Sequence, residues 1–190
     1  MHYNMNYVLF TVALISFLLY ARSSHAVLFY DYGPKALNKV ILICAALFAL
    51  VHLWLLWRTP VHSHKFANVA FLSYITGLII FLSAKRAIST YRLSLSFAPD
   101  LPPWMLSKGI YQTIRHPFFL AFCLTWFGGV LEAHCLRTTV STAIMLCIYW
   151  LAAKRQERNY ESSMLAAEYR SYKNRTGMFF PSLKQLSYRR

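Results

Sequence analysis

Residues 66–84 read FANVAFLSYITGLIIFLSA, nineteen positions without an Asp, Glu, Lys or Arg. A helix rises about 1.5 Å per residue, so this block reaches roughly 28 Å, close to the ~30 Å of a bilayer's hydrocarbon core. Four further blocks free of those residues cover 5–20, 40–57, 118–131 and 138–153. With only 14% charged residues, the 190-residue chain cannot cover a water-soluble surface. The sequence predicts an all-α, polytopic integral membrane protein with about five transmembrane helices.

Two of the five blocks leave alternatives open. Residues 118–131 are few for a crossing, and the glycine pair 128–129 and Glu132 interrupt their end. This block tilts, begins near Pro117, or forms a re-entrant hairpin with the next one. The first block ends near residues 24–26, which resemble a signal-peptide cleavage site, but no Lys or Arg precedes it, which favours a retained span.

The basic residues predict the orientation, because positively charged loops stay on the cytosolic side. Residues 20–39, 85–117 and 154–190 carry 17 of the 20 Lys and Arg residues, and the alternate segments carry 3. We therefore expect an extracytosolic N-terminus and a cytosolic C-terminal helix. The net charge of the chain is +14, and the basic residues that produce it lie beside the predicted spans. This position indicates membrane lipids rather than nucleic acid as the partner.

The chain divides in character into a three-span part, residues 1–84, and a part that carries the cytosolic chemistry, residues 85–190. The proline-rich residues 97–104 predict an irregular turn and a candidate lid. From Lys154 onward no Gly or Pro occurs before Gly177, which predicts one helix leaving the membrane. The sequence leaves the oligomeric state open.

A first candidate site is the segment GIYQTIRHP at residues 109–117. Pro117 suits the first turn of a helix, which places His116 at the cap and Arg115 beside it. Unpaired amides and the helix dipole attract an anion at such an end, so a carboxylate or phosphate fits there. The alternative is that Arg115 anchors the chain at the cytosolic face and His116 is an interfacial side chain.

A second candidate site is one face of the tail helix. Glu157, Glu161, Glu168 and Tyr172 lie within about 60 degrees of one another on a helix of 3.6 residues per turn. Glu157 and Glu161 repel each other by a few tenths of a kcal/mol unless a cation or a donor-rich ligand lies between them. The alternative is a solvated helix in which Lys154 pairs with Glu157 and Arg158 with Glu161.

The residues of the two candidate sites, taken together in their order along the chain, form a pattern. This pattern resembles the membrane methyltransferases of the isoprenylcysteine carboxyl methyltransferase and phospholipid N-methyltransferase superfamily. The resemblance covers roughly residues 107–183, including the stretch 175–177. The matching residues are Gly109, Tyr111, Arg115, His116, Pro117, Glu157, Glu168, Tyr169, Tyr172 and Pro181.

The resemblance implies an enzyme that binds S-adenosylmethionine from the cytosol, between the R-H-P turn and the tail helix. The cofactor-binding set would be Gly109, Tyr111, Arg115, His116, Pro117, Glu157, Tyr169 and Tyr172. Arg115 and His116 would bind the methionine carboxylate, Glu157 a ribose hydroxyl or the amine, and the three tyrosines would close around the cofactor.

The reaction implied is methyl transfer to a lipophilic acceptor that enters from the bilayer. A carboxylate acceptor needs no base, whereas an amine must first lose a proton, for which Glu161 or Glu157 is available. Arg115 completes the catalytic set with these two acids.

The chain departs from the family pattern at four positions. Family members usually have Tyr where Phe119 stands, an acid at Arg158, and Phe-Gly at Leu165 and Ala166. Two other interpretations stay open: a membrane NADPH-dependent sterol-type reductase, and a non-catalytic membrane protein that retains the fold. Sterol reductases are similar in their terminal spans but are longer.

Other histidines rank lower as functional residues. His52 lies inside the second block, where a hydrogen bond to a neighbouring helix is favoured over catalysis. His62 and His64 have no nearby acid or cysteine. We therefore expect no metal site.

Overall fold

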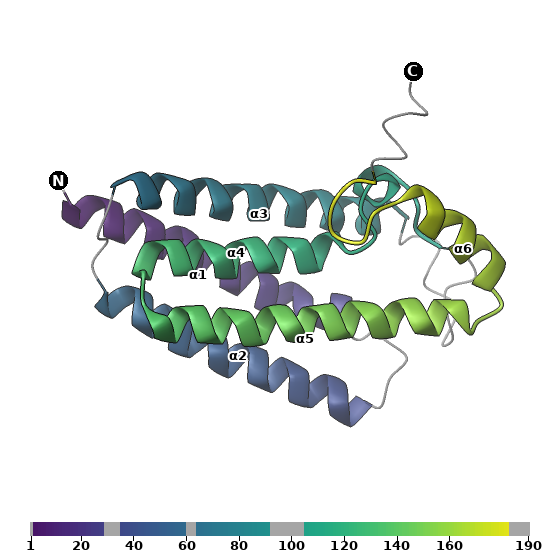
Figure 1. Ribbon diagram of the computed structural model, residues 1–190, viewed down its shortest axis with the longest axis horizontal. Helices are drawn as coiled ribbons and strands as arrows, with labels where there is room; N and C mark the ends of the chain where they lie inside the picture. The colour runs from purple at the N-terminus through teal and green to yellow at the C-terminus, as the bar shows by residue number, and fades with distance from the viewer. Residues whose placement is uncertain (1, 29–34, 60–63, 92–104, 183–190) are drawn as a thin grey trace, which may run out of the picture. The chain divides into compact units, whose positions relative to one another are not determined.

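The structure is a computed structural model, and it describes residues 2–28, 35–59, 64–91 and 105–182 (Figure 1). Within these ranges the regular elements are helices, and the one paired extended segment is an isolated bridge between Ile114 and Gly177. The helices are α1 (His2–Leu28), α2 (Lys35–Arg58), α3 (His64–Tyr91), the short 3-10 helix η2 (Gly109–Gln112), α4 (Pro117–Ala133), α5 (Leu136–Glu161) and α6 (Ala166–Arg175). The all-α class is confirmed.

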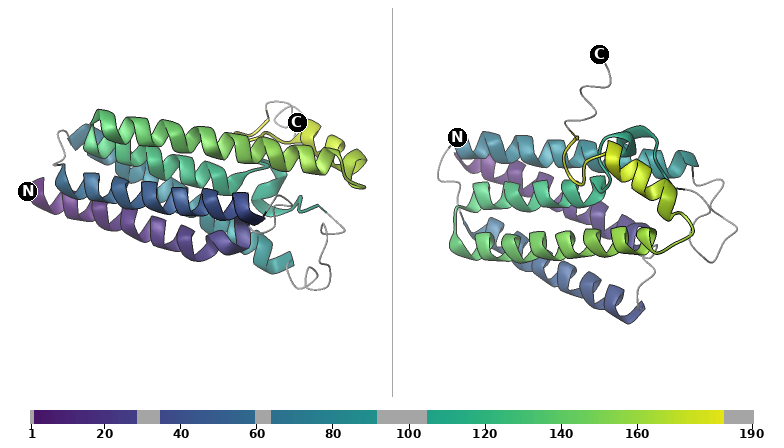
Figure 2. Two further views of the ribbon diagram at one scale, coloured as in Figure 1. Left: turned by 90° about the horizontal axis from the view of Figure 1, so that it is seen from below. Right: turned by 45° about the vertical axis from the view of Figure 1, so that its right-hand side comes forward.

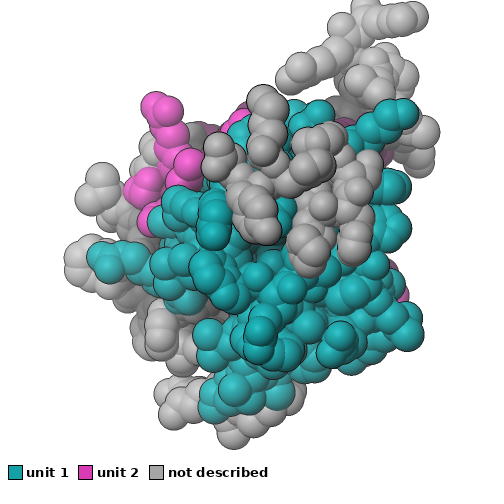
Figure 3. All heavy atoms as spheres, turned by 90° about the vertical axis from the view of Figure 1, so that its left-hand side faces the viewer, with its two compact units in different colours: residues 1–78, 121–149 teal, residues 79–120, 150–190 magenta. Residues whose placement is uncertain are grey.

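The chain forms two compact units, coloured separately in Figure 3. Unit 1 comprises residues 1–78 and 121–149, and unit 2 comprises 79–120 and 150–190. Both units therefore take pieces from α3, α4 and α5. The boundaries of the two compact units differ from the division at residue 84, which was predicted on functional grounds. That division stays a prediction.

Three of the described helices are long and apolar enough to cross a membrane. They cover Met5–Ser23, Lys65–Ser89 and Leu136–Glu161, and the described parts of two more, Ile43–Arg58 and Pro117–Ala133, form shorter apolar helices. The prediction of a helical membrane protein is therefore supported at the level of three candidate spans.

One face of α2, in unit 1, is exposed and apolar. Along α2, Ile43, Leu47, Leu50, Trp54 and Trp57 recur at spacings of three and four, and they are between 54 and 64% exposed. Residues at this spacing share one helix face. A face this apolar is costly in water and ordinary in hydrocarbon.

The inside of unit 1 holds polar side chains that explain the glycine pair of α4. A Cβ at Gly128 would lie 2.7 Å from the Tyr74 ring, and one at Gly129 would lie 1.9 Å from His52 Nε2. The Tyr74 hydroxyl donates a 2.7 Å hydrogen bond to Glu132, which is 1% exposed. The glycines are therefore packing surface, and α4 continues through them to Ala133 as one helix. Of the three alternatives, the start at Pro117 is confirmed.

His52 joins α2 to α5 within unit 1. Its Nδ1 lies 3.4 Å from Ser141 Oγ, and its ring packs edge-on against Trp126 at a centroid distance of 4.7 Å. The expected hydrogen bond to a neighbouring helix is confirmed.

Candidate functional site

The first candidate segment forms a turn that delivers two side chains to the start of α4. Gly109 opens η2 with φ of +61°, a conformation that glycine adopts without strain. Pro117 is the first residue of α4, and the His116 carbonyl accepts the Leu120 amide at 3.1 Å. His116 is thus the N-cap, and the prediction for both residues is confirmed.

The single tail helix predicted from Lys154 to Gly177 is wrong. Helix α5 ends at Glu161, and α6 begins at Ala166 after a turn (Figure 2). The Ser162 hydroxyl donates to the Arg158 carbonyl, and the Ser163 hydroxyl donates to Tyr160 and accepts the Leu165 amide. Serine hydroxyls compete in this way with the helical ladder, which ends the helix without Gly or Pro.

Because of that turn, the segment after α6 pairs with the R-H-P turn. The Gly177 amide donates to Thr113, and the Gly177 carbonyl accepts from the Arg115 amide at 2.9 Å. The His116 amide donates to Met178 at 3.1 Å. A Cβ on Gly177 would lie 1.6 Å from the Phe180 carbonyl, so the position has room only for glycine.

Arg115 is the fixed centre of unit 2. Its Nε donates to Glu157 Oε1 at 2.8 Å, and its Nη1 donates to the carbonyls of Lys173 and Thr176. Its side chain is 9% exposed. The guanidinium therefore ties the R-H-P turn to α5 and to the end of α6, and most of its donor capacity is spent inside the protein.

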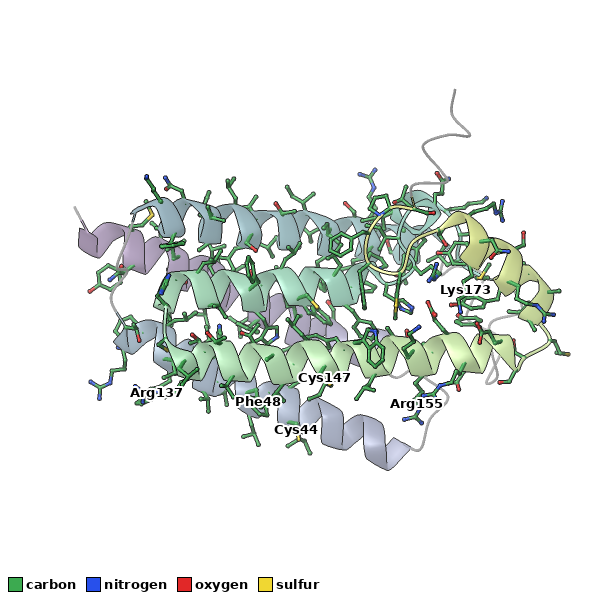
Figure 4. All side chains as sticks on the ribbon, viewed as in Figure 1. Cys44, Phe48, Arg137, Cys147, Arg155 and Lys173 are labelled. Atoms are coloured by element: carbon green, nitrogen blue, oxygen red, sulfur yellow. The ribbon has the colours of Figure 1, made fainter. Side chains whose placement is uncertain are left out.

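Glu157 and Glu161 have different partners from those expected. Besides Arg115, Glu157 Oε1 lies 3.4 Å from His116 Nε2, and Glu157 Oε2 lies 3.5 Å from Lys173 Nζ. Lys173 also approaches Glu161 Oε1 at 2.6 Å. The cation required between the two acids is therefore a lysine of α6 (Figure 4). Lys173 thus pairs with these acids in place of Lys154 and Arg158, the partners that the alternative interpretation predicted.

His116 is the side chain of the site with unused hydrogen-bonding capacity. Its ring stacks on Phe119 with centroids 5.7 Å apart, and Phe179 lies 6.1 Å away on a tilted plane. Its Nε2 is buried and makes no hydrogen bond within the described chain, since its 3.4 Å approach to Glu157 lacks the geometry. A phenylalanine at position 119 thus holds the imidazole by stacking.

A cluster of tyrosines adjoins the acids. The Tyr172 hydroxyl donates to the Tyr111 carbonyl at 2.7 Å, and Tyr160 stacks on Tyr169 at 5.1 Å with Met105 against the same cluster. Burial raises the pKa of Tyr172 well above its usual value. Burial, followed by the nearby Glu157 carboxylate, raises the pKa of Tyr169 in the same direction. These hydroxyls remain neutral donors at physiological pH.

The structure brings most of the predicted site residues together in unit 2, in two groups. Arg115, His116, Glu157 and Glu161 form the charged group, and Tyr111, Tyr169 and Tyr172 form the aromatic group. Gly109 and Pro117 shape the backbone, with Gly109 beside Ala87 of α3. Glu168 is exposed in the first turn of α6, so its predicted place on the acidic face is wrong.

Sequence reasoning missed Lys173 and Thr176. The signal that could have found Lys173 is the Ser162-Ser163 pair, because a turn there folds the later residues back onto α5. Two of the departures from the family pattern lie at this turn, where Leu165 is the N-cap of α6 and Ala166 its first residue. Arg158 is exposed.

The site combines two carboxylates, the buried Arg115 guanidinium, the partly exposed Lys173 ammonium and one buried imidazole nitrogen. This set can hold a zwitterion, with donors for a carboxylate and acceptors for an ammonium group. The described residues contain no cluster of three or more His, Cys, Asp or Glu side chains suited to a metal ion. The predicted lid at residues 97–104 and His62 lie outside the described residues. Compared with known proteins, the chain matches no family model, no curated protein and no solved structure.

Proposed function

We propose that the protein is an S-adenosylmethionine-dependent membrane methyltransferase that acts on a lipophilic acceptor. The observation that carries this proposal is that Arg115 and His116 both approach the buried carboxylate of Glu157. Arg115 and Glu157 are 42 residues apart in sequence. The resemblance of residues 107–183 to membrane methyltransferases supports the same reading.

The residues present fit the methionine end of the cofactor. His116 Nε2 is a buried polar atom without a hydrogen bond, and a ligand carboxylate would supply its partner. Glu157 and Glu161 would accept from the ammonium group. Arg115 is a positioning residue in this proposal, because its contacts hold Glu157 and the carbonyl of Thr176.

The cofactor, when bound, supplies an activated methyl group on a sulfonium centre. The chain's own work is to align the acceptor in line with that methyl group and to exclude water. Buried Tyr169 and Tyr172 exclude water from one side of the charged group.

We also propose five spans, with the N-terminus extracytosolic and α6 on the cytosolic side. The 17-to-3 distribution of basic residues supports this orientation. The exposed apolar face of α2 supports counting it as a span. The acceptor would then enter from the inner leaflet as a prenylated or phospholipid-like carboxylate or amine.

Binding and labelling test the function directly. Purified protein in detergent should bind S-adenosylhomocysteine in calorimetry and should not bind reduced nicotinamide cofactor. His116→Ala and Glu157→Gln should bind S-adenosylhomocysteine more weakly than wild type, whereas Arg170→Ala, an exposed residue of α6, should not differ. Unchanged affinity in both site variants would refute the assignment.

Labelled S-adenosylmethionine added to cell membranes that contain the protein should place label in one lipid species. Label that base removes indicates a methyl ester, and base-stable label indicates a methylated amine. Membranes that contain the Glu157→Gln variant are the control and should transfer less label.

A non-catalytic role is the second candidate, and one observation favours it. Both acids are already paired with cations of the chain, so the charged group is complete without a ligand. Absence of S-adenosylhomocysteine binding by folded wild-type protein would select this candidate.

A further inference from the structure

Lys173 is the cation that contacts both acids of the site. Its Nζ lies 2.6 Å from Glu161 Oε1 and 3.5 Å from Glu157 Oε2. The lysine comes from α6, whereas the acids come from the end of α5. It therefore fills the position where two carboxylates converge.

The two cations of the site are held in different ways. The Arg115 guanidinium is 9% exposed and also bonds two backbone carbonyls. The Lys173 side chain is 36% exposed, and its flexible four-carbon stem lets the ammonium move while Arg115 fixes the backbone carbonyl. The described contacts of the Lys173 ammonium are thus the two acids alone, whereas the Arg115 guanidinium also holds the backbone at the end of α6.

Resting on the proposed function, in which Glu157 and Glu161 accept from the ammonium group of the cofactor, we propose that Lys173 occupies the position of that ammonium group as an internal cation until the ligand displaces it. An independent observation supports a zwitterionic ligand here. His116 Nε2 is buried, lacks a hydrogen bond and lies 3.4 Å from the same Glu157 carboxylate. It supplies the donor that a neighbouring ligand carboxylate needs.

Charge balance is consistent with this exchange. The acids Glu157 and Glu161 are matched by Arg115 and Lys173. A zwitterion adds no net charge, and the freed lysine moves into water, to which it is already partly open. Lys173 therefore competes with the ligand ammonium and limits the affinity for the cofactor.

Calorimetry on the purified full chain in detergent tests the displacement. The Lys173→Met variant should bind S-adenosylhomocysteine roughly two- to fivefold tighter than wild type, the range expected for releasing a partly exposed ion pair. The deaminated analogue, which keeps the carboxylate and the nucleoside, should gain nothing. Lys154→Met is the matched control, since Lys154 lies over the Trp150 ring and contacts neither acid in the structure; it should bind like wild type.

A second variant guards against misfolding of the first. Glu161→Gln changes a residue that is 38% exposed, and it should weaken binding of S-adenosylhomocysteine but not of the deaminated analogue. Equal or weaker binding of S-adenosylhomocysteine by folded Lys173→Met overturns the displacement while leaving the proposed function standing. Failure of the wild type to bind S-adenosylhomocysteine overturns both.

Discussion

Removing the Arg115 guanidinium should destabilise the protein strongly. Glu157 is only 2% exposed, and the Arg115→Met substitution removes the guanidinium that donates to its carboxylate at 2.8 Å. The carbonyls of Lys173 and Thr176 lose the same donor. Breaking a buried pair by removing one partner costs about 3–5 kcal/mol. Lys173 still faces Glu157 at 3.5 Å, so we expect about 3 kcal/mol.

Glu157→Gln should cost less than Arg115→Met. The amide oxygen can still accept from Arg115 Nε, so a charge-assisted hydrogen bond becomes a neutral one, at about 1–2 kcal/mol. The double variant should be more stable than the sum of the single losses predicts, by about 1–2 kcal/mol, because the pair is broken only once.

The assay is unfolding of the purified protein in mixed micelles with increasing SDS, followed by circular dichroism. Arg175→Met is the matched control, because Arg175 is exposed and its Nε bonds only the Ser171 carbonyl one turn earlier in the described contacts. It should change the free energy of unfolding by less than about 0.5 kcal/mol. Strict additivity, or a loss below about 1 kcal/mol in Arg115→Met, would refute the central role of the pair.

Three further changes test other parts of the structure. Gly129→Ala should destabilise unit 1 by about 1–3 kcal/mol in the same assay because the new methyl group meets the His52 ring, and adding His52→Ala should recover part of the loss. Gly177→Ala should weaken S-adenosylhomocysteine binding in calorimetry because its Cβ meets a carbonyl three residues later; unchanged affinity would contradict the pairing. At alkaline pH, the tyrosines of the site should ionise late: burial raises the pKa of Tyr111 and Tyr172, so unfolding releases protons above pH 10. Their contribution to stability is complete below pH 10 and is lost as pH rises further, and a tyrosinate absorbance titration that matches unfolded protein would contradict this.

The pairing within the charged group changes how the R-H-P turn should be understood. Anion binding at a helix N-terminus was expected from Arg115 and His116 together. In the structure the arginine binds the protein's own carboxylate and carbonyls, and His116 Nε2 is buried without a hydrogen bond. Under the proposed function, Arg115 is the positioning residue and His116 the residue that contacts the ligand.

The sequence by itself determined the all-helical class, the presence of helices long and apolar enough to cross a membrane, and the start of α4. Long blocks without charge favour apolar helices, and the fixed φ angle of Pro117 suits the first turn of a helix. These are local properties, so no knowledge of distant residues is required. The same locality made Gly128 and Gly129 look like a weak point, because the rings that fill the space beside them come from other helices.

Only the tertiary structure decided how the charged group is assembled. The turn at Ser162 and Ser163 depends on hydrogen bonds from the serine hydroxyls to backbone carbonyls. These bonds differ little in free energy from those of a continuing helix, and the periodicity of the sequence carries no information about that difference. Once the chain folds back, Lys173 reaches the acids and Glu168 is carried away from them. A helical wheel describes residues on a single helix axis. Here the residues that contact one another come from two helices, α5 and α6.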